Sequence, residues 1–288
     1  LLSTFVMTVS VLLVSLVVND HLEREGEDGP EVYGLMLSAL IGGIIMVLAN
    51  DLLVLFLGLE TLSLAFYLMV ASSRKRSTSG EAGLKYFILG GFSSAFLLYG
   101  IALLYGATGT TKLSGIAAVL NETISLQRVD AFLLIGIALL LVGLAFKIAA
   151  VPFHVWTPDV YQGSPSPITA FMAAATKVAA FGAMLRIFYV SLGGAVYSWK
   201  PIFTAVAILT MVVGSVIAIA QRDIKRMLAY SSIAHAGFLL TGVIALNQEG
   251  LKASLFYLAS YGVATIGAFA LVTLVRDSSG EVGDLNRW

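Results

Sequence analysis

Cysteine is absent from the 288 residues, and histidine occurs only three times, as His21, His154 and His235. The sequence therefore contains no thiolate that could hold an iron–sulfur cluster. The three histidines are too scattered to predict a metal site. Any redox chemistry in which this chain takes part is expected to occur in another subunit.

Charge is also scarce. Charged residues make up 12% of the chain and hydrophobic residues 58%, whereas about 25% charge is usual in a soluble domain. The 17 basic and 17 acidic residues balance, so the chain has no basic field that could hold nucleic acid or coat an anionic membrane surface. This composition predicts a membrane protein and argues against nucleic acid as a partner.

The two ends of the sequence lack the features of complete termini. Residue 1 is Leu and opens an apolar run that reaches Val18, without a basic segment or a small-residue cleavage site. A signal peptide is therefore not expected. The polar tail from Arg276 to Trp288 follows the last apolar run, and we interpret the sequence as a piece of a longer protein.

Apolar runs of the length that crosses a membrane, about 20 residues, recur along the whole chain. They lack the short alternation of a membrane barrel, and helices satisfy every backbone group internally. We therefore predict an all-α polytopic membrane bundle of about nine transmembrane helices. Trp156 and Trp199 fall near predicted span ends, where tryptophan anchors helices at the membrane interface. The runs cover residues 1–18, 33–49, 52–71, 86–106, 131–151, 167–191, 201–220, 227–246 and 253–275.

Lysine and arginine are unequally shared between alternate connections, and this bias predicts orientation. The richer set is placed in the cytoplasm, together with the acidic stretch 23–31. The richer set comprises Arg24, Arg74, Lys75, Arg76, Lys85, Arg222, Lys225, Arg226, Arg276 and Arg287. The poorer set comprises Lys112, Arg128, Lys200 and Lys252.

Of the 34 charged residues, 30 lie outside the apolar runs, so the remaining four need an explanation. Arg186 is near a span end, from which its long side chain can reach the interface. Glu60 and Lys177 fall near the middle of their runs. Ionisable groups at that depth indicate function by default.

Lys147 lies close to the end of the run 131–151, but the apolar unit extends from 131 to 161 and contains Pro152 and Pro158. Proline removes a backbone donor and bends a helix, so residues 146–154 are interpreted as a break inside the membrane, with Pro152 as its structural cause. Such breaks are tolerated only where protein packs around them or where they line a wet cavity.

Each intramembrane charge costs about 2.5–3.5 kcal/mol, so these groups are expected to find one another. One hypothesis is a buried Glu60–Lys147 ion pair that only locks helix to helix. The other is a proton relay from Lys147 to Lys177, in which His235 bridges to the next site because imidazole titrates near neutral pH. A histidine that is simply hydrogen-bonded between helices remains an alternative for His235.

With these residues placed, the segment 146–163, FKIAAVPFHVWTPDVYQG, resembles the signature of the subunit N family of NADH-quinone oxidoreductase, called subunit 2 in organelles. The continuation 164–177 and the segment 223–235, DIKRMLAYSSIAH, are similar to the same antiporter-like superfamily, as is Gly58-Leu59-Glu60. The stretch 161–163 favours subunit N over its larger relatives and over multisubunit sodium/proton antiporters.

The resemblance implies two five-helix repeats of inverted topology, each with a discontinuous helix. Residues 1–32 would be a truncated N-terminal helix with an acidic loop, 33–191 the first repeat, and 192–288 the start of the second. The resemblance also implies that Glu60 and Lys147 form a coupling pair, that Lys177 is the next proton carrier, and that His235 helps to connect half-channels. The second broken helix and its lysine would lie beyond Trp288.

The function implied by the resemblance is proton pumping in a bacterial cell membrane, within a complex of other membrane-arm subunits. NADH, flavin, iron–sulfur clusters and quinone would all be held elsewhere in that complex, with no cofactor in this chain. Two alternatives remain open from the residues alone. One is a component of a monovalent cation/proton antiporter, and the other is an assembly scaffold with an inactive channel.

Overall fold

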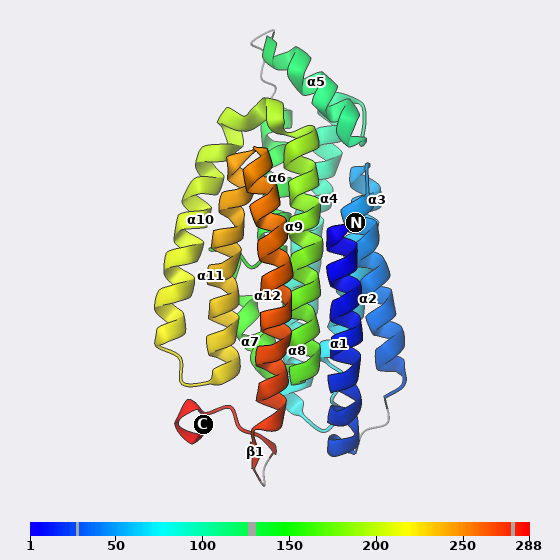
Figure 1. Ribbon diagram of the computed structural model, residues 1–288. Helices are drawn as coiled ribbons and strands as arrows, with labels where there is room; N and C mark the ends of the chain where they lie inside the picture. The colour runs from blue at the N-terminus through cyan, green and yellow to red at the C-terminus, as the bar shows by residue number, and fades with distance from the viewer. Residues whose placement is uncertain (27–28, 126–130, 278–279) are drawn as a thin grey trace.

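The chain folds into a bundle of long helices that run side by side, with a short hairpin at its lower end (Figure 1). The computed structural model describes residues 1–26, 29–125, 131–277 and 280–288. Arg128 and part of the acidic stretch 23–31 lie outside these residues. The α-helices are α1 Leu2–Glu25, α2 Glu31–Leu48, α3 Leu52–Val70, α4 Ser77–Thr108, α5 Leu113–Ser125, α6 Ala131–Lys147, α7 Trp156–Gly163, α8 Ser166–Phe171, α9 Lys177–Arg186, α10 Val196–Ile219, α11 Ile224–Ala245 and α12 Gln248–Leu274. The remaining elements are the π-helical segments η1 Met172–Thr176 and η2 Ile187–Ser191, the 3-10 turns η3 Gly193–Ala195 and η4 Leu285–Arg287, and the antiparallel strands β1 Arg276–Asp277 and β2 Gly280–Glu281.

Within the described ranges, eight helices are long and apolar enough to cross a membrane, and α6 is a shorter apolar helix. Each of the nine predicted runs falls in one of them, so the prediction of an all-helical, multi-pass membrane protein is confirmed. The helix α5 was not predicted, because its 13 residues are too few to cross a membrane. It lies across the upper end of the bundle (Figure 1), where it buries Leu113, Ile116 and Leu120.

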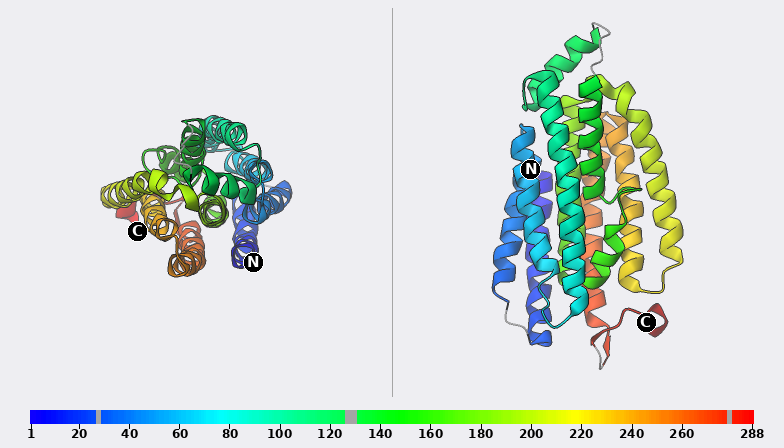
Figure 2. Two further views of the ribbon diagram at one scale, coloured as in Figure 1. Left: turned by 90° about the horizontal axis from the view of Figure 1, so that it is seen from above. Right: turned by 180° about the vertical axis from the view of Figure 1, so that it is seen from behind.

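The segment Ser166–Ser191 forms the centre of the bundle. It runs through α8, η1, α9 and η2 as one continuous span, and its apolar window is entirely buried. Viewed from above, this segment lies between the first helices of the chain and the last (Figure 2). The π-helical turn η1 ends directly before Lys177. Such turns are rare and are frequent at functional sites.

Glycines allow neighbouring helices to approach closely, as expected in membrane bundles. A Cβ atom on Gly100 of α4 would lie 2.6 Å from the backbone nitrogen of Leu140 in α6. A Cβ atom on Gly214 of α10 would lie 2.6 Å from the backbone nitrogen of Ala234 in α11. The backbones of these two helix pairs therefore meet without side chains between them.

The predicted break separates α6 from α7, and Pro152 lies in the connection between them. Backbone groups freed by the break find partners: the Val151 amide donates to the Thr210 hydroxyl at 3.0 Å, and the Trp156 indole donates to the Phe146 carbonyl at 3.1 Å. These bonds satisfy polar backbone at a depth where water is scarce. Trp156 is buried and stacked on Tyr86, so the expectation that it anchors the chain at the membrane interface was wrong.

Trp199 is likewise buried, with its ring against Phe188 and its indole donating to the Leu192 carbonyl at 2.9 Å. Its expected place at the interface was also wrong, because the ring packs against Phe188 of the π-helical turn η2 inside the bundle. The assignment of the lysine-rich connections to the cytoplasm stays a prediction. One member of that set, Lys225, is only 5% exposed, because it belongs to the first turn of α11 rather than to a solvated loop.

Candidate functional site

Lys147, the last residue of α6, is 4% exposed and lies where α6 meets α3 and α4. Its ammonium donates to the Ser63 hydroxyl at 2.6 Å and to the Tyr86 hydroxyl at 3.5 Å. It also lies 6.0 Å from the ring centre of Tyr67 and 5.5 Å from that of Tyr86. Hydroxyl oxygens and aromatic faces thus surround the cation.

Glu60 lies on α3, three residues before Ser63, and is only partly buried. Its carboxylate accepts a hydrogen bond from the Ser94 hydroxyl of α4. The direct Glu60–Lys147 ion pair expected from the sequence is not formed, because a serine hydroxyl lies closer to each charge and provides its hydrogen bond. The role of the two residues as a coupling pair stays a prediction.

A small cavity lies between these groups, bordered by Ser94, Lys147, Tyr67 and the wall formed by Gly90 and Gly143. Its volume of about 10 Å³ is close to that needed for one water molecule. Ser94, the partner of Glu60, therefore shares a cavity with Lys147. This cavity can hold the water that would connect the carboxylate side of the site to the ammonium.

Lys177 lies on the central span, directly after η1, and is 3% exposed. Its ammonium donates to the backbone carbonyl of Ser232 in α11 and lies 4.9 Å from the ring centre of Tyr261 in α12. The ion pairs found in the described part of the chain provide it with no carboxylate. Among the described residues, the contacts of the Lys177 ammonium are thus a backbone carbonyl and an aromatic face.

The Ser232 hydroxyl lies among several polar groups close to Lys177. It accepts from the Tyr261 hydroxyl at 2.9 Å and lies 3.4 Å from the Tyr161 hydroxyl of α7. His235, one turn further along α11, has its Nδ1 2.5 Å from the Tyr257 hydroxyl and its ring 5.0 Å from that of Tyr261. Tyr261 therefore contacts both Lys177 and His235.

A cavity of about 430 Å³ opens beside this cluster, between α11 and α12. His235, Ser231, Tyr257 and Thr265 contribute polar groups to its lining. The cavity is large enough for several water molecules. Through His235, the Lys177 cluster reaches a space that can be hydrated.

The structure thus brings the four predicted residues into two clusters, one around Lys147 with Glu60 and one around Lys177 with His235. The hydroxyls that complete the clusters were missed, because serine and tyrosine are too common in helices to be selected without coordinates. One signal was present: Ser63 follows Glu60 by three residues and therefore shares its helix face. In the described residues, no group of three His, Asp or Glu side chains could hold a metal ion.

Comparison with known proteins completes the description of the site. A family model described as NADH:quinone oxidoreductase/Mrp antiporter, transmembrane, matches residues 49–287, which include both clusters. The chain belongs to this family. The resemblance noted in the segments 146–163 and 223–235 is therefore a true relationship of the antiporter-like membrane proteins.

Curated relatives in this family carry the name NADH-quinone oxidoreductase subunit N. The protein of Rhodococcus opacus is 60% identical over 266 residues, which cover 92% of this chain and 49% of the relative. That of Mycobacterium tuberculosis strain H37Rv is 55% identical over 271 residues, covering 92% of this chain and 50% of the relative. The chain spans about half the length of the curated relatives it matches.

Solved structures of the family agree with the fold. A chain of respiratory complex I from Thermus thermophilus, determined with bound aureothin, superimposes with a TM-score of 0.78 at 38% identity. The match covers 96% of this chain and 56% of that one. A chain of the Mrp complex from Dietzia sp. superimposes with a TM-score of 0.79 at 26% identity, covering 93% and 49%.

Proposed function

We propose that the full-length protein is a proton-translocating membrane subunit of NADH-quinone oxidoreductase. Quinone reduction elsewhere in the complex would drive a proton from Lys147 toward Lys177 and His235, with Glu60 as the coupling group. The observation that carries this proposal is the pair of lysines buried in the membrane interior, each held by hydroxyl, carbonyl or aromatic groups instead of a carboxylate.

A buried ammonium without a carboxylate is expensive, so its protonation responds strongly to charges that approach or leave. Glu60 is such a charge, and the water-sized cavity beside Ser94 gives it a route to Lys147. A movement that brings Glu60 closer would favour the protonated form of Lys147, and a movement away would favour release. The proton is then the only species that this chain needs to move.

The setting of this function is a bacterial cell membrane, in a complex whose other membrane-arm subunits flank this chain. The bacterial relatives named subunit N support this setting. The cofactors of the redox reaction, NADH, flavin, iron–sulfur clusters and quinone, would be held by other subunits. Residues 33–191 and 192–288 would belong to two successive repeats, the second continuing beyond Trp288.

The Lys147→Ala substitution tests the proposal in the assembled complex. Inverted membrane vesicles would be energised with NADH, and acidification would be followed together with NADH oxidation. Protons pumped per electron should fall sharply, because the substitution removes the group that receives the proton. The control is Lys200→Ala, which removes an exposed lysine of α10 and should leave the ratio unchanged. A normal ratio in Lys147→Ala would refute the proposed role.

The sodium/proton antiporter hypothesis rests on the same buried lysines, and it is further supported by the family model, whose description includes Mrp antiporters, and by the 26% identity to the Mrp complex chain. Identities of 53–60% to proteins named subunit N favour the redox-driven complex. Acidification that depends on sodium and not on NADH would reverse this choice. Normal pumping by a Glu60→Gln variant that assembles poorly would instead indicate a scaffold.

A further inference from the structure

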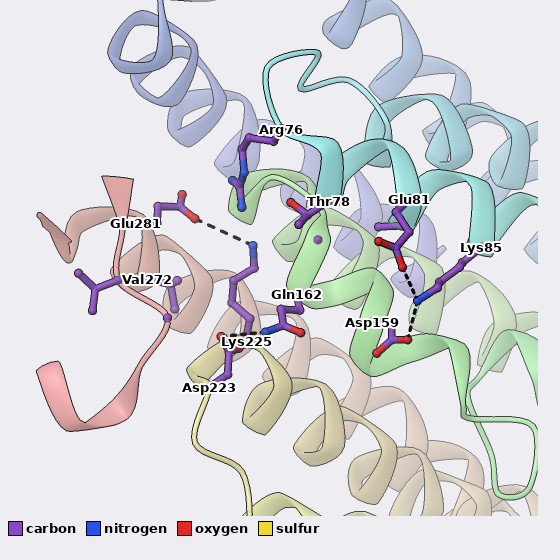
Figure 3. A pocket seen from close by; sticks show the side chains of 14 residues that line it. Arg76, Thr78, Glu81, Lys85, Asp159, Gln162, Asp223, Lys225, Val272 and Glu281 are labelled. Atoms are coloured by element: carbon purple, nitrogen blue, oxygen red, sulfur yellow. Dashed lines mark hydrogen bonds and ion pairs between the residues drawn. The ribbon is translucent and has the colours of Figure 1, made fainter. Parts of the chain in front are cut away.

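A second charged site lies at the lower end of the bundle, apart from the two lysine clusters. A pocket of about 400 Å³ opens there between α4, α7, α11 and the C-terminal hairpin (Figure 3). Its lining includes Lys85, Asp159, Asp223, Lys225 and Glu281. Positive and negative groups alternate, so the pocket has no single sign of charge that would favour an anion or a cation.

One carboxylate in this pocket is buried. The Glu281 side chain, on β2, is 7% exposed. Its Oε2 accepts a hydrogen bond from the Ser166 hydroxyl at 2.6 Å and lies 4.0 Å from the Lys225 ammonium. That ammonium in turn donates to the Ser164 carbonyl at 2.6 Å. A hairpin outside the membrane span thus inserts a carboxylate between the ends of the central span and α11.

The other oxygen of this carboxylate is without a hydrogen-bond partner. Glu281 Oε1 lies 3.5 Å from Nδ1 of His21 in α1, and within the described part of the chain neither atom has a hydrogen-bond partner. Both atoms are buried. A buried polar atom left unpaired is costly. A proton between Nδ1 and Oε1 would satisfy both atoms, and it is either the Nδ1–H of neutral His21 or a further proton that the pair takes up.

Other charged residues lie on the elements that surround the Glu281–His21 pair. Glu25 of α1 pairs with Arg276 of β1 at 2.5 Å, Arg76 precedes α4, and Asp223 caps the start of α11. Glu25 does not line the pocket. Its ion pair with Arg276 nevertheless connects the C-terminal hairpin to α1, as the contact between Glu281 and His21 does. Glu25 therefore serves as a natural comparison for Glu281.

Ser166 places the Glu281 carboxylate at the start of the span that carries Lys177. Eleven residues separate them, about 16 Å along a helix. Polar groups lie along this distance: the Thr169 hydroxyl donates to the Pro165 carbonyl at 3.1 Å, and the Tyr161 hydroxyl lies 3.4 Å from that of Ser232, whose carbonyl binds Lys177. Gln162 and Gly163, which follow Tyr161, line the pocket itself.

We propose that Glu281, with His21 and Lys225, is the group that loads protons into the chain from the lower pocket. The Glu281 carboxylate, which lines the pocket, takes up a proton from pocket water, and this proton comes to rest between Oε1 and His21 Nδ1 while Oε2 keeps its bond to Ser166. The proton then passes inward to neutral Lys177, which becomes an ammonium, and the carboxylate returns to its starting charge. This inference rests on the proposed function, in which Lys177 carries a proton, and it gives Lys177 a supply from the lower pocket besides the one from Lys147.

The test compares Glu281→Gln with Glu25→Gln in the complete membrane complex. Glu281→Gln keeps the size and the hydrogen-bonding oxygen of the side chain but removes its ability to take up a proton. Proton translocation should fall by about a hundredfold, the lower end of the range for removing an acid–base group, and the loss should grow as the pH on the pocket side is raised. Glu25→Gln should retain native pumping, and Glu281→Asp should recover part of it.

Native pumping in Glu281→Gln would overturn the proposal. Equal losses in Glu281→Gln and Glu25→Gln, with no dependence on pH, would also overturn it, because both residues would then act only as tethers of the hairpin. The Lys147→Ala variant separates this result from failure of the proposed function. If Lys147→Ala pumps normally while Glu281→Gln does not, the loading role stands and the relay through Lys147 is wrong.

Discussion

The ammonium of Lys147 lies 2.6 Å from the hydroxyl of Ser63, one helical turn from Glu60 on α3. Ser63 is fully buried, and its hydroxyl also donates to the Leu59 carbonyl at 2.5 Å. A neutral hydroxyl thus occupies the place where a carboxylate was expected. Lys147 is held in position without being locked into an ion pair, which suits the proposed release of its proton.

Ser63→Ala should slow proton pumping by about tenfold or more, because a hydrogen bond to a charged group contributes about 1.5–3 kcal/mol. The rate of NADH-driven acidification would be measured in vesicles that contain equal amounts of complex. Ser38→Ala is the matched control, since the Ser38 hydroxyl donates to the Gly34 carbonyl of its own helix. Equal rates in the two variants would show that Ser63 does not support Lys147.

His235 and Tyr257 should act as one unit, because Nδ1 of the histidine lies 2.5 Å from the tyrosine hydroxyl. A double-mutant cycle with His235→Ala and Tyr257→Phe should give a coupling energy of about 0.5–3 kcal/mol in the pumping rate. Additive effects of the two substitutions would contradict this and would make His235 an ordinary helix-packing histidine. NADH oxidation, measured in parallel, separates pumping from electron transfer.

Two glycines of α4 predict opposite effects of the same substitution. Gly100→Ala forces a Cβ atom to within 2.6 Å of the α6 backbone and should destabilise the protein by about 1–3 kcal/mol. Gly91→Ala meets nothing within 4 Å and should stabilise the helix by up to about 1 kcal/mol. Thermal unfolding in detergent measures both. A similar midpoint for the two variants would mean that α4 and α6 do not pack as described.

Asp51, which precedes α3 at the upper end, should make stability depend on pH. Burial raises the pKa of its carboxyl, but hydrogen bonds from the Thr111 hydroxyl and from the Leu53 and Val54 amides outweigh burial, and the pKa is lowered. The carboxylate therefore stabilises the fold above its unfolded pKa, and this stability is lost as the pH falls through the folded pKa.

Asp51→Ala should lower the free energy of unfolding near neutral pH by about 0.5–2 kcal/mol, the usual effect of losing such a helix cap. The difference from the native protein should shrink in acid. Thermal unfolding of both proteins near neutral pH and at about pH 3 checks this. If the two proteins differ in stability by the same amount at both pH values, the charge of Asp51 does not contribute to stability.

The sequence predicts the spans well because membrane insertion demands long apolar runs, and it predicts the α6–α7 break because Pro152 has no backbone donor to continue a helix. It does not predict which groups neutralise the buried charges. Ser63 and Ser94 are recognisable only once α3 and α4 are placed beside α6.

The pocket at the lower end was not foreseen for a related reason. Glu281 and His21 are 260 positions apart, and only the fold brings the hairpin against α1. Lys225 was assigned to a solvated loop because it adjoins Arg222 and Arg226 in a charged stretch. The structure instead points its side chain inward from the first turn of α11, toward the Ser164 carbonyl. Local composition does not determine that direction.

The most direct measurement of the central claim is the number of protons pumped per electron in the complete complex carrying Lys177→Met. Methionine fills the buried site without a titratable group, so the ratio should fall to the value expected for Lys147→Ala. NADH oxidation should still reduce quinone. Lys252→Met, at an exposed position of α12, should keep the native ratio. A native ratio in Lys177→Met would contradict the account that buried lysines carry the proton.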